Sequence, residues 1–124
     1  YAHDRDAGAK HARAREEVRK LWGADEPPCI SVQVLQELFV SLCRLGVPVA
    51  EASDAMRDYA SWRVIDNTVQ LCECGIAEME RWHVSFWDGL ILAAARKAGV
   101  TAIWSEDLNA GQDYGGIRVV NPLA

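Results

Sequence analysis

The sequence predicts a three-layer α/β/α domain with a short, mostly parallel central sheet. Short apolar runs of strand length alternate with longer stretches of helical periodicity along the chain, which is typical of this class. The run at residues 101–104 (TAIW) is continuously apolar, as expected for a strand in the middle of a parallel sheet. The length of 124 residues, with half of them apolar and a quarter charged, fits one globular domain over residues 1–124.

The first half of the chain is expected to contain three helices and two short strands. Gly23 ends a helix rich in Ala, Arg, Glu and Lys, Ser31 caps a second helix, and Pro48 lies in the first turn of a third. Pro27 and Pro28 force an extended chain before the first strand. The expected elements are a helix at 10–22, a strand at 29–30, helices at 32–45 and 49–60, and a strand at 63–65.

The second half is expected to contain two helices and two strands. Ser85 caps a helix that ends at Gly99 and is apolar on nearly every side, so this helix should be the most buried one. A polar, glycine-containing loop at 105–116 separates the two strands. The expected elements are helices at 67–81 and 86–98 and strands at 101–104 and 117–120.

Charge and hydropathy narrow the class of protein. The net charge is −5, and residues 21–124 hold fourteen acids against seven bases, which argues against a broad nucleic-acid-binding surface. No apolar run approaches the roughly 20 residues that span a bilayer, and residues 1–10 lack the apolar core of a signal peptide. The four cysteines lack zinc-site spacing and are expected to be reduced packing residues, so we expect a cytoplasmic protein with no membrane partner.

Two features allow two interpretations each. The basic residues between Lys10 and Lys20 form either a solvated helix face or a guide for phosphate groups. The tryptophans are interpreted as packing residues because they lie at the ends of expected elements, with stacking on nucleic-acid bases as the alternative. They are Trp22, Trp62, Trp82, Trp87 and Trp104.

Three carboxylates occupy positions at which α/β proteins bind ligands. Glu37 lies in the middle of its helix, on the border of the apolar stripe, Asp88 lies in the first turn of the helix that follows Ser85, and Asp107 follows a strand. Each has an ordinary structural interpretation, as a solvated helix residue, an acid on a helix dipole and a turn residue respectively. None of the three signals is decisive alone.

The three carboxylates together predict a site for a divalent cation. An α/β sheet can bring them into one cleft at its carboxyl edge, where crowded carboxylates repel unless a cation or protonation neutralises them. Oxygen ligands favour a hard cation such as Mg²⁺ or Mn²⁺. Such an ion polarises a phosphoryl oxygen and activates a bound water. The physical chemistry therefore points to metal-dependent hydrolysis of phosphodiesters.

Four stretches resemble the PIN-domain family of the VapC toxin type, in the same order and over essentially the whole chain. They are residues 31–37 (SVQVLQE), 82–95 (WHVSFWDGLILAAA), 103–111 (IWSEDLNAG) and 119–122 (VVNP). The resemblance implies a Mg²⁺-dependent endoribonuclease in which Glu37, Asp88 and Asp107 are the catalytic metal ligands and Ser105 supports them. It also implies an RNA substrate, an antitoxin protein that blocks the site, and a homodimer.

The sequence departs from this family at its beginning. The family opens with a strand that carries a central Asp in an Asp-Thr-Asn-like motif, shortly before a pair like Tyr1-Ala2, and Asp4 and Asp6 are poor substitutes for that Asp. A catalytically inactive or truncated PIN-like module that binds RNA or a protein is therefore the alternative. A flavodoxin-like binding domain would require a phosphate-binding loop after the first strand, and the sequence has none.

Overall fold

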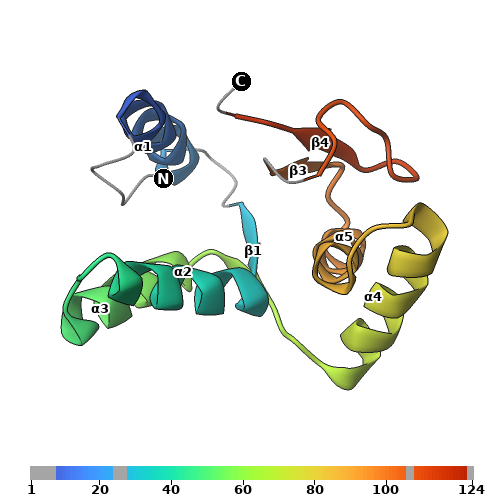
Figure 1. Ribbon diagram of the computed structural model, residues 1–124, viewed down its shortest axis with the longest axis horizontal. Helices are drawn as coiled ribbons and strands as arrows, with labels where there is room; N and C mark the ends of the chain where they lie inside the picture. The colour runs from blue at the N-terminus through green and yellow to red at the C-terminus, as the bar shows by residue number, and fades with distance from the viewer. Residues whose placement is uncertain (1–7, 24–27, 106–107, 123–124) are drawn as a thin grey trace. The chain divides into compact units, whose positions relative to one another are not determined.

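The computed structural model describes residues 8–23, 28–105 and 108–122 (Figure 1). These residues form helices and short strands in alternation, which confirms the predicted α/β class. They divide into two compact units, with the boundary after Val64, inside a strand. The prediction of a single domain stays a prediction.

The first unit contains two short strands and three helices. Ser31 begins a helix as predicted, because its Oγ accepts a hydrogen bond from the backbone N–H of Val34 at 3.2 Å. The two strands form a two-stranded sheet. The elements are α1 (Ala9–Trp22), β1 (Cys29–Ser31), α2 (Val32–Arg44), α3 (Val49–Tyr59) and β2 (Arg63–Ile65).

The apolar stripe of α2 is buried only in part. Leu35 and Leu42 are 7% and 3% exposed, so the centre of the predicted stripe packs against the rest of this unit. The apolar spacing of this helix also predicts that Leu45 shares the buried face, and this is wrong because Leu45 is 49% exposed. The physical reason is that α2 ends at Arg44, and Leu45 already belongs to the C-terminal cap.

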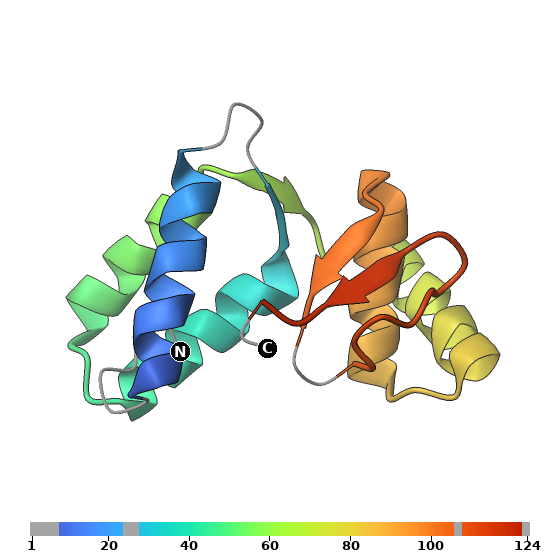
Figure 2. The ribbon, with the colours of Figure 1, turned by 90° about the horizontal axis from the view of Figure 1, so that it is seen from above.

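The second unit places two helices and a parallel strand pair together (Figure 2). Its core contains Leu92 from one helix and Ile103 and Val119 from the two strands, which are paired with each other. The elements are α4 (Val69–Trp82), α5 (Phe86–Ala98), β3 (Ala102–Trp104) and β4 (Arg118–Val120).

The helix α5 is the most buried helix of the described chain, as predicted. Leu92 at its centre has no exposed surface. Gly89 lies so close to α4 that a methyl group there would clash with the carbonyl oxygen of Gly75. A methyl group on Gly75 would in turn lie 2.8 Å from Cδ2 of Leu90. The two glycines therefore allow the two helices to pack with their backbones in close approach.

The predicted start of α4 and the predicted burial of β3 need correction. The helix α4 begins at Val69, two residues later than predicted, because Oγ1 of Thr68 accepts a hydrogen bond from the N–H of Leu71 and caps it. The strand β3 buries Ile103 but exposes Ala102 and Trp104, whereas the sequence predicted a strand in the middle of a sheet. Its apolar run therefore covers the core with one face only.

Candidate functional site

Asp88 occupies the first turn of α5, half-buried, as the sequence predicts. The Oγ of Ser85 accepts a hydrogen bond from the N–H of Asp88 at 3.1 Å, so Ser85 is the cap of this helix. Within the described residues, the Asp88 carboxylate itself makes no hydrogen bond and no salt bridge. It therefore lies at the positive end of a helix dipole with its oxygens available to a ligand.

Glu37 lies in the middle of α2 and is exposed. Its Oε1 accepts a hydrogen bond from Nε2 of Gln33, one helical turn earlier, at 3.1 Å. Gln33 is only 8% exposed, so a buried amide holds this carboxylate in place. This hydrogen bond orients one carboxylate oxygen of Glu37 and leaves the other without a described hydrogen-bond partner. Such an oriented carboxylate is more typical of a metal ligand than of a freely solvated glutamate.

Ser105 follows β3 and holds the start of the next loop. Its N–H donates to the carbonyl oxygen of Val120 at 3.0 Å, and its Oγ accepts from the N–H of Leu108 at 3.2 Å. Asp107 lies outside the described residues, as do Asp4 and Asp6. The supporting role predicted for Ser105 stays a prediction.

The donor chemistry of the predicted site fits a hard divalent cation. Glu37, Asp88 and Asp107 offer only carboxylate oxygens, which Mg²⁺ and Mn²⁺ prefer. Glu37 belongs to the first unit and Asp88 to the second, and no group of three potential metal ligands occurs within the residues that the structure describes. That these three carboxylates share one ion therefore stays a prediction.

A partly buried ion-pair network in the second unit is a feature that the sequence analysis missed. Glu78 of α4 is 8% exposed and forms a salt bridge with Arg96 of α5, while its Oε2 accepts a hydrogen bond from Nε1 of Trp82 at 2.7 Å. The signal was present in the sequence: Glu78 shares the helix face of the buried Leu71 and Gly75. A glutamate in an apolar stripe needs a cation or hydrogen-bond donors nearby.

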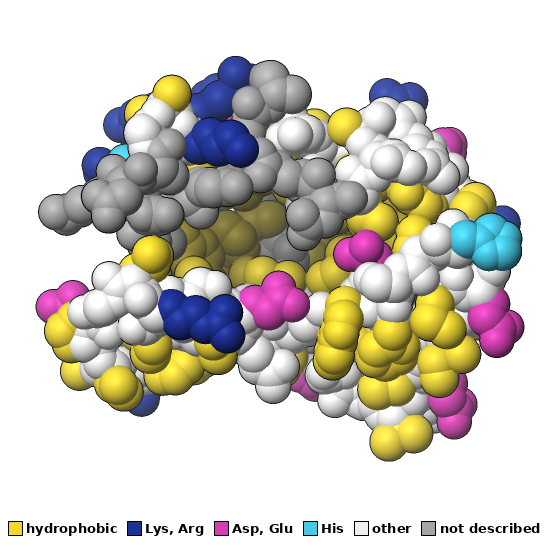
Figure 3. Space-filling view, viewed as in Figure 1, with side chains coloured by type: hydrophobic (Ala, Val, Ile, Leu, Met, Phe, Trp, Pro, Cys, Tyr) yellow, Lys and Arg dark blue, Asp and Glu magenta, His cyan; other side chains and the backbone are white. Residues whose placement is uncertain are grey.

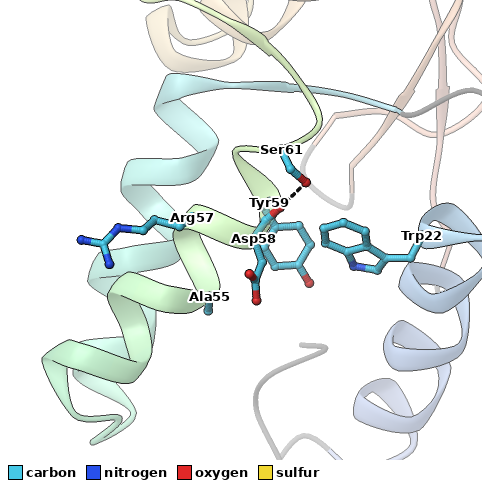
Figure 4. A pocket seen from close by; sticks show the side chains of 6 residues that line it. All are labelled: Trp22, Ala55, Arg57, Asp58, Tyr59 and Ser61. Carbon is cyan, nitrogen blue, oxygen red and sulfur yellow. Dashed lines mark hydrogen bonds between the residues drawn. The ribbon is translucent and has the colours of Figure 1, made fainter.

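Three aromatic rings form a cluster in the first unit. Ring centroids lie 4.8 Å apart for Trp22 and Trp62, 5.0 Å for Tyr59 and Trp62, and 5.5 Å for Trp22 and Tyr59. Beside them is an open hollow of about 460 Å³, which we call the aromatic hollow (Figure 4). Its described lining residues are Trp22, Ala55, Arg57, Asp58, Tyr59 and Ser61.

Burial raises the pKa of the Tyr59 hydroxyl, and the charge of Asp58 acts in the same direction, against a hydrogen bond with Trp22 that lowers it. The net pKa lies above the ordinary value, so the phenol carries its proton at neutral pH. The aromatic hollow is therefore lined by neutral rings, with the carboxylate of Asp58 as its charged acceptor.

An exposed apolar surface lies on the second unit, where hydrophobic side chains gather over α4 (Figure 3). Val69 and Ile76 of α4 are 76% and 45% exposed, and Trp87 at the start of α5 is 62% exposed. Large exposed apolar surfaces are typical of places that a protein partner covers. No helix within the described residues is long and apolar enough to cross a membrane.

Comparison with known proteins relates the chain to others through its fold. No protein-family model matches the sequence, and no curated protein matches it. A solved structure described as a toxin-antitoxin complex from Klebsiella pneumoniae contains a similar chain, with a TM-score of 0.63 and 19% sequence identity. The match covers 87% of the present chain and 84% of that chain, so the two share a fold.

Proposed function

We propose that this protein is a metal-dependent endoribonuclease, the toxin of a toxin–antitoxin pair. The observation that carries the proposal is the shared fold over 87% of the chain with a chain from a toxin-antitoxin complex. The sequence motifs that resemble VapC-type PIN domains point to the same class independently. An antitoxin protein is then the expected partner, and exposed apolar side chains of the second unit, among them Val69, Ile76 and Trp87, are candidates for contact with it.

In this proposal Glu37, Asp88 and Asp107 hold Mg²⁺ or Mn²⁺, which polarises the phosphodiester and activates a water when bound. The protein's own residues orient these ligands. Ser85 fixes the backbone at Asp88, and Gln33 holds one oxygen of Glu37. The Oγ of Ser105 accepts a hydrogen bond from the N–H of Leu108 and fixes the backbone there. The available Asp88 carboxylate supports the assignment because a residue used only as a reciprocal helix cap would bond back to the backbone.

The test is cleavage of a labelled single-stranded RNA with Mg²⁺, with Mn²⁺ and with EDTA. We expect cleavage with either ion, none with EDTA, and none by the Asp88→Asn variant at any metal concentration. The matched control is Asp54→Asn, which makes the same change at an exposed acid of α3 outside the proposed site. Cleavage by Asp88→Asn at the native rate would end the assignment.

Failure of the native chain to cut while it still binds RNA would favour the alternative, an inactive PIN-like module. A homodimer is part of the proposal and is measured separately, by the molar mass of the protein in solution.

A further inference from the structure

We propose that the aromatic hollow is a stacking subsite for one base of a single-stranded RNA, with a preference for bases that carry an exocyclic amino group. The choice of RNA as the strand rests on the proposed function. The subsite lies within the first unit and is defined by its own side chains, Trp22, Tyr59 and Asp58, none of which belongs to the predicted metal site.

The rings provide the stacking surface. Trp22 is 44% exposed although it touches two other aromatic rings, so part of its indole surface remains open to solvent. Figure 4 shows its side chain extending from α1 toward Tyr59 of α3, with Asp58 and Ser61 around the same hollow. Aromatic side chains hold unpaired bases by stacking, and a hollow of about 460 Å³ has room for one base.

The charge pattern favours a polyanion along α1. This helix carries five bases and two acids in a protein whose net charge is −5, and it ends at Trp22. Arg19 pairs with Glu16 and Lys20 with Glu17, and the helix as a whole holds three more bases than acids. Proteins bind single-stranded nucleic acids by combining positive charge, which attracts the phosphates, with exposed aromatic rings, on which the bases stack. The helix α1, with Trp22 at its end, offers both. An acidic protein segment would match the charge of α1 but would not need the open indole.

The position of Asp58 indicates which bases fit. Its carboxylate lines the aromatic hollow and, among the described residues, makes no hydrogen bond or salt bridge, so it can accept a hydrogen bond from a ligand. Arg57 points away from Trp22 in Figure 4 and pairs with Asp54 instead, at 3.4 Å. A negative charge at this place repels a phosphate but accepts from the amino group of cytosine, as carboxylates do in base recognition. Uracil offers no such amino group.

The experiment measures binding of 5′-labelled hexacytidylate and hexauridylate by fluorescence anisotropy, with EDTA present so that no metal-dependent cleavage occurs. We expect the native chain to bind hexacytidylate more tightly than hexauridylate. Trp22→Leu should weaken binding of both RNAs by about fivefold or more, the lower end of the effect of losing one base–aromatic stack. Trp22→Phe keeps an aromatic ring and should restore most of the affinity.

The carboxylate is tested by a matched pair on α3. Asp58→Asn should reduce the preference for cytidine by about threefold or more, the effect of one hydrogen bond. Glu51→Gln removes an equal charge from α3 at a residue that does not line the aromatic hollow and does not pair with Arg57, and it should leave the preference unchanged. Melting curves establish that each variant is folded, and the Asp58 pair remains informative if Trp22→Leu does not fold.

The possible outcomes separate this proposal from the proposed nuclease. Equal affinities of the native chain and Trp22→Leu for both RNAs would overturn the stacking subsite, whether or not the protein cuts RNA, and would leave the aromatic hollow as a protein-packing surface. The protein could instead bind RNA with a base preference that depends on Trp22 and yet never cut RNA. This outcome would support the stacking subsite and refute the proposed nuclease function.

Discussion

Arg96 of α5 donates two hydrogen bonds to the carboxylate of Glu78 on α4. The donors are its Nε and its Nη2, and Nη2 lies 3.0 Å from Oε2. The same guanidinium donates to the carbonyl oxygens of Tyr114 and Gly115, at 2.9 and 3.0 Å. One side chain thus connects two helices and the loop that precedes β4. Arginine suits this role because its planar fork can bind a carboxylate and backbone oxygens at once.

This pair makes stability depend on pH in the acid range. Burial raises the pKa of Glu78, but hydrogen bonds from Arg96 and Trp82 and the charges of Arg96 and Arg81 outweigh it, so the pKa lies below its ordinary value. A lowered carboxyl pKa contributes stability above the unfolded-state pKa, and this contribution is lost as the pH falls through the folded-state pKa. We therefore expect the melting temperature to decrease when the pH is lowered past about 4.5, which is near the ordinary glutamate pKa.

Glu78→Gln isolates this effect because glutamine keeps the shape and loses the charge. The variant should melt at a lower temperature than the native chain at pH 7, and the gap should narrow toward pH 3. A gap that stays constant over this range would contradict the assignment. Arg96→Met leaves the Glu78 carboxylate without its cation. Because the Arg96 side chain is 34% exposed and solvent screens part of the pair, the cost should be about 1–2 kcal/mol of unfolding free energy at pH 7.

Gly89→Ala should destabilise the second unit by about 1–3 kcal/mol, because the new methyl group meets the backbone of Gly75, which cannot move aside as a flexible side chain would. The matched control is Gly23→Ala, at which the nearest atom to an added methyl group lies 3.7 Å away and the backbone has a negative φ. Chemical denaturation of both variants measures the difference. Equal stability of the two would show that α4 and α5 do not need a close approach at this point.

Leu92→Asp should leave the chain unfolded, because it places an unpaired charge at a position with no exposed surface. Leu92→Ala provides a graded version and should cost about 3 kcal/mol. Val69→Asp, at a position that is 76% exposed, is the control and should remain folded. Circular dichroism and thermal melting distinguish these cases. A soluble Leu92→Asp protein with a native melting curve would refute the central position of α5.

Asp88→Asn and Ser85→Ala should separate metal binding from helix capping. Ser85→Ala removes the hydrogen bond to the N–H of Asp88 and should cost about 1 kcal/mol of stability. Asp88→Asn removes a charge from the proposed carboxylate cluster, so the metal-free melting temperature should stay equal or rise while cleavage is lost. If Asp88 acts only on the helix dipole, this variant should instead melt slightly lower and still cut RNA.

The helix boundaries follow from short-range chemistry, so the sequence alone predicts them within two residues. Ser31 and Ser85 each accept a hydrogen bond from an N–H three residues later, and Gly99 takes the left-handed conformation that ends α5. These interactions involve neighbours in the chain, and the residue types that make them are few. The predicted start of α4 at residue 67 is wrong by two residues, because Thr68 lies outside the helix as its cap and accepts a hydrogen bond from the N–H of Leu71.

The sequence by itself thus determined the α/β class, the burial of α5 and the presence of Asp88 in its first turn. Only the tertiary structure decided that Glu78 meets Arg96, eighteen residues away, and that Trp22 meets Tyr59 across two different helices. The physical reason is that such contacts depend on how whole elements pack. Residue spacing along one helix reports which face is apolar, but not which side chain of another element that face will meet.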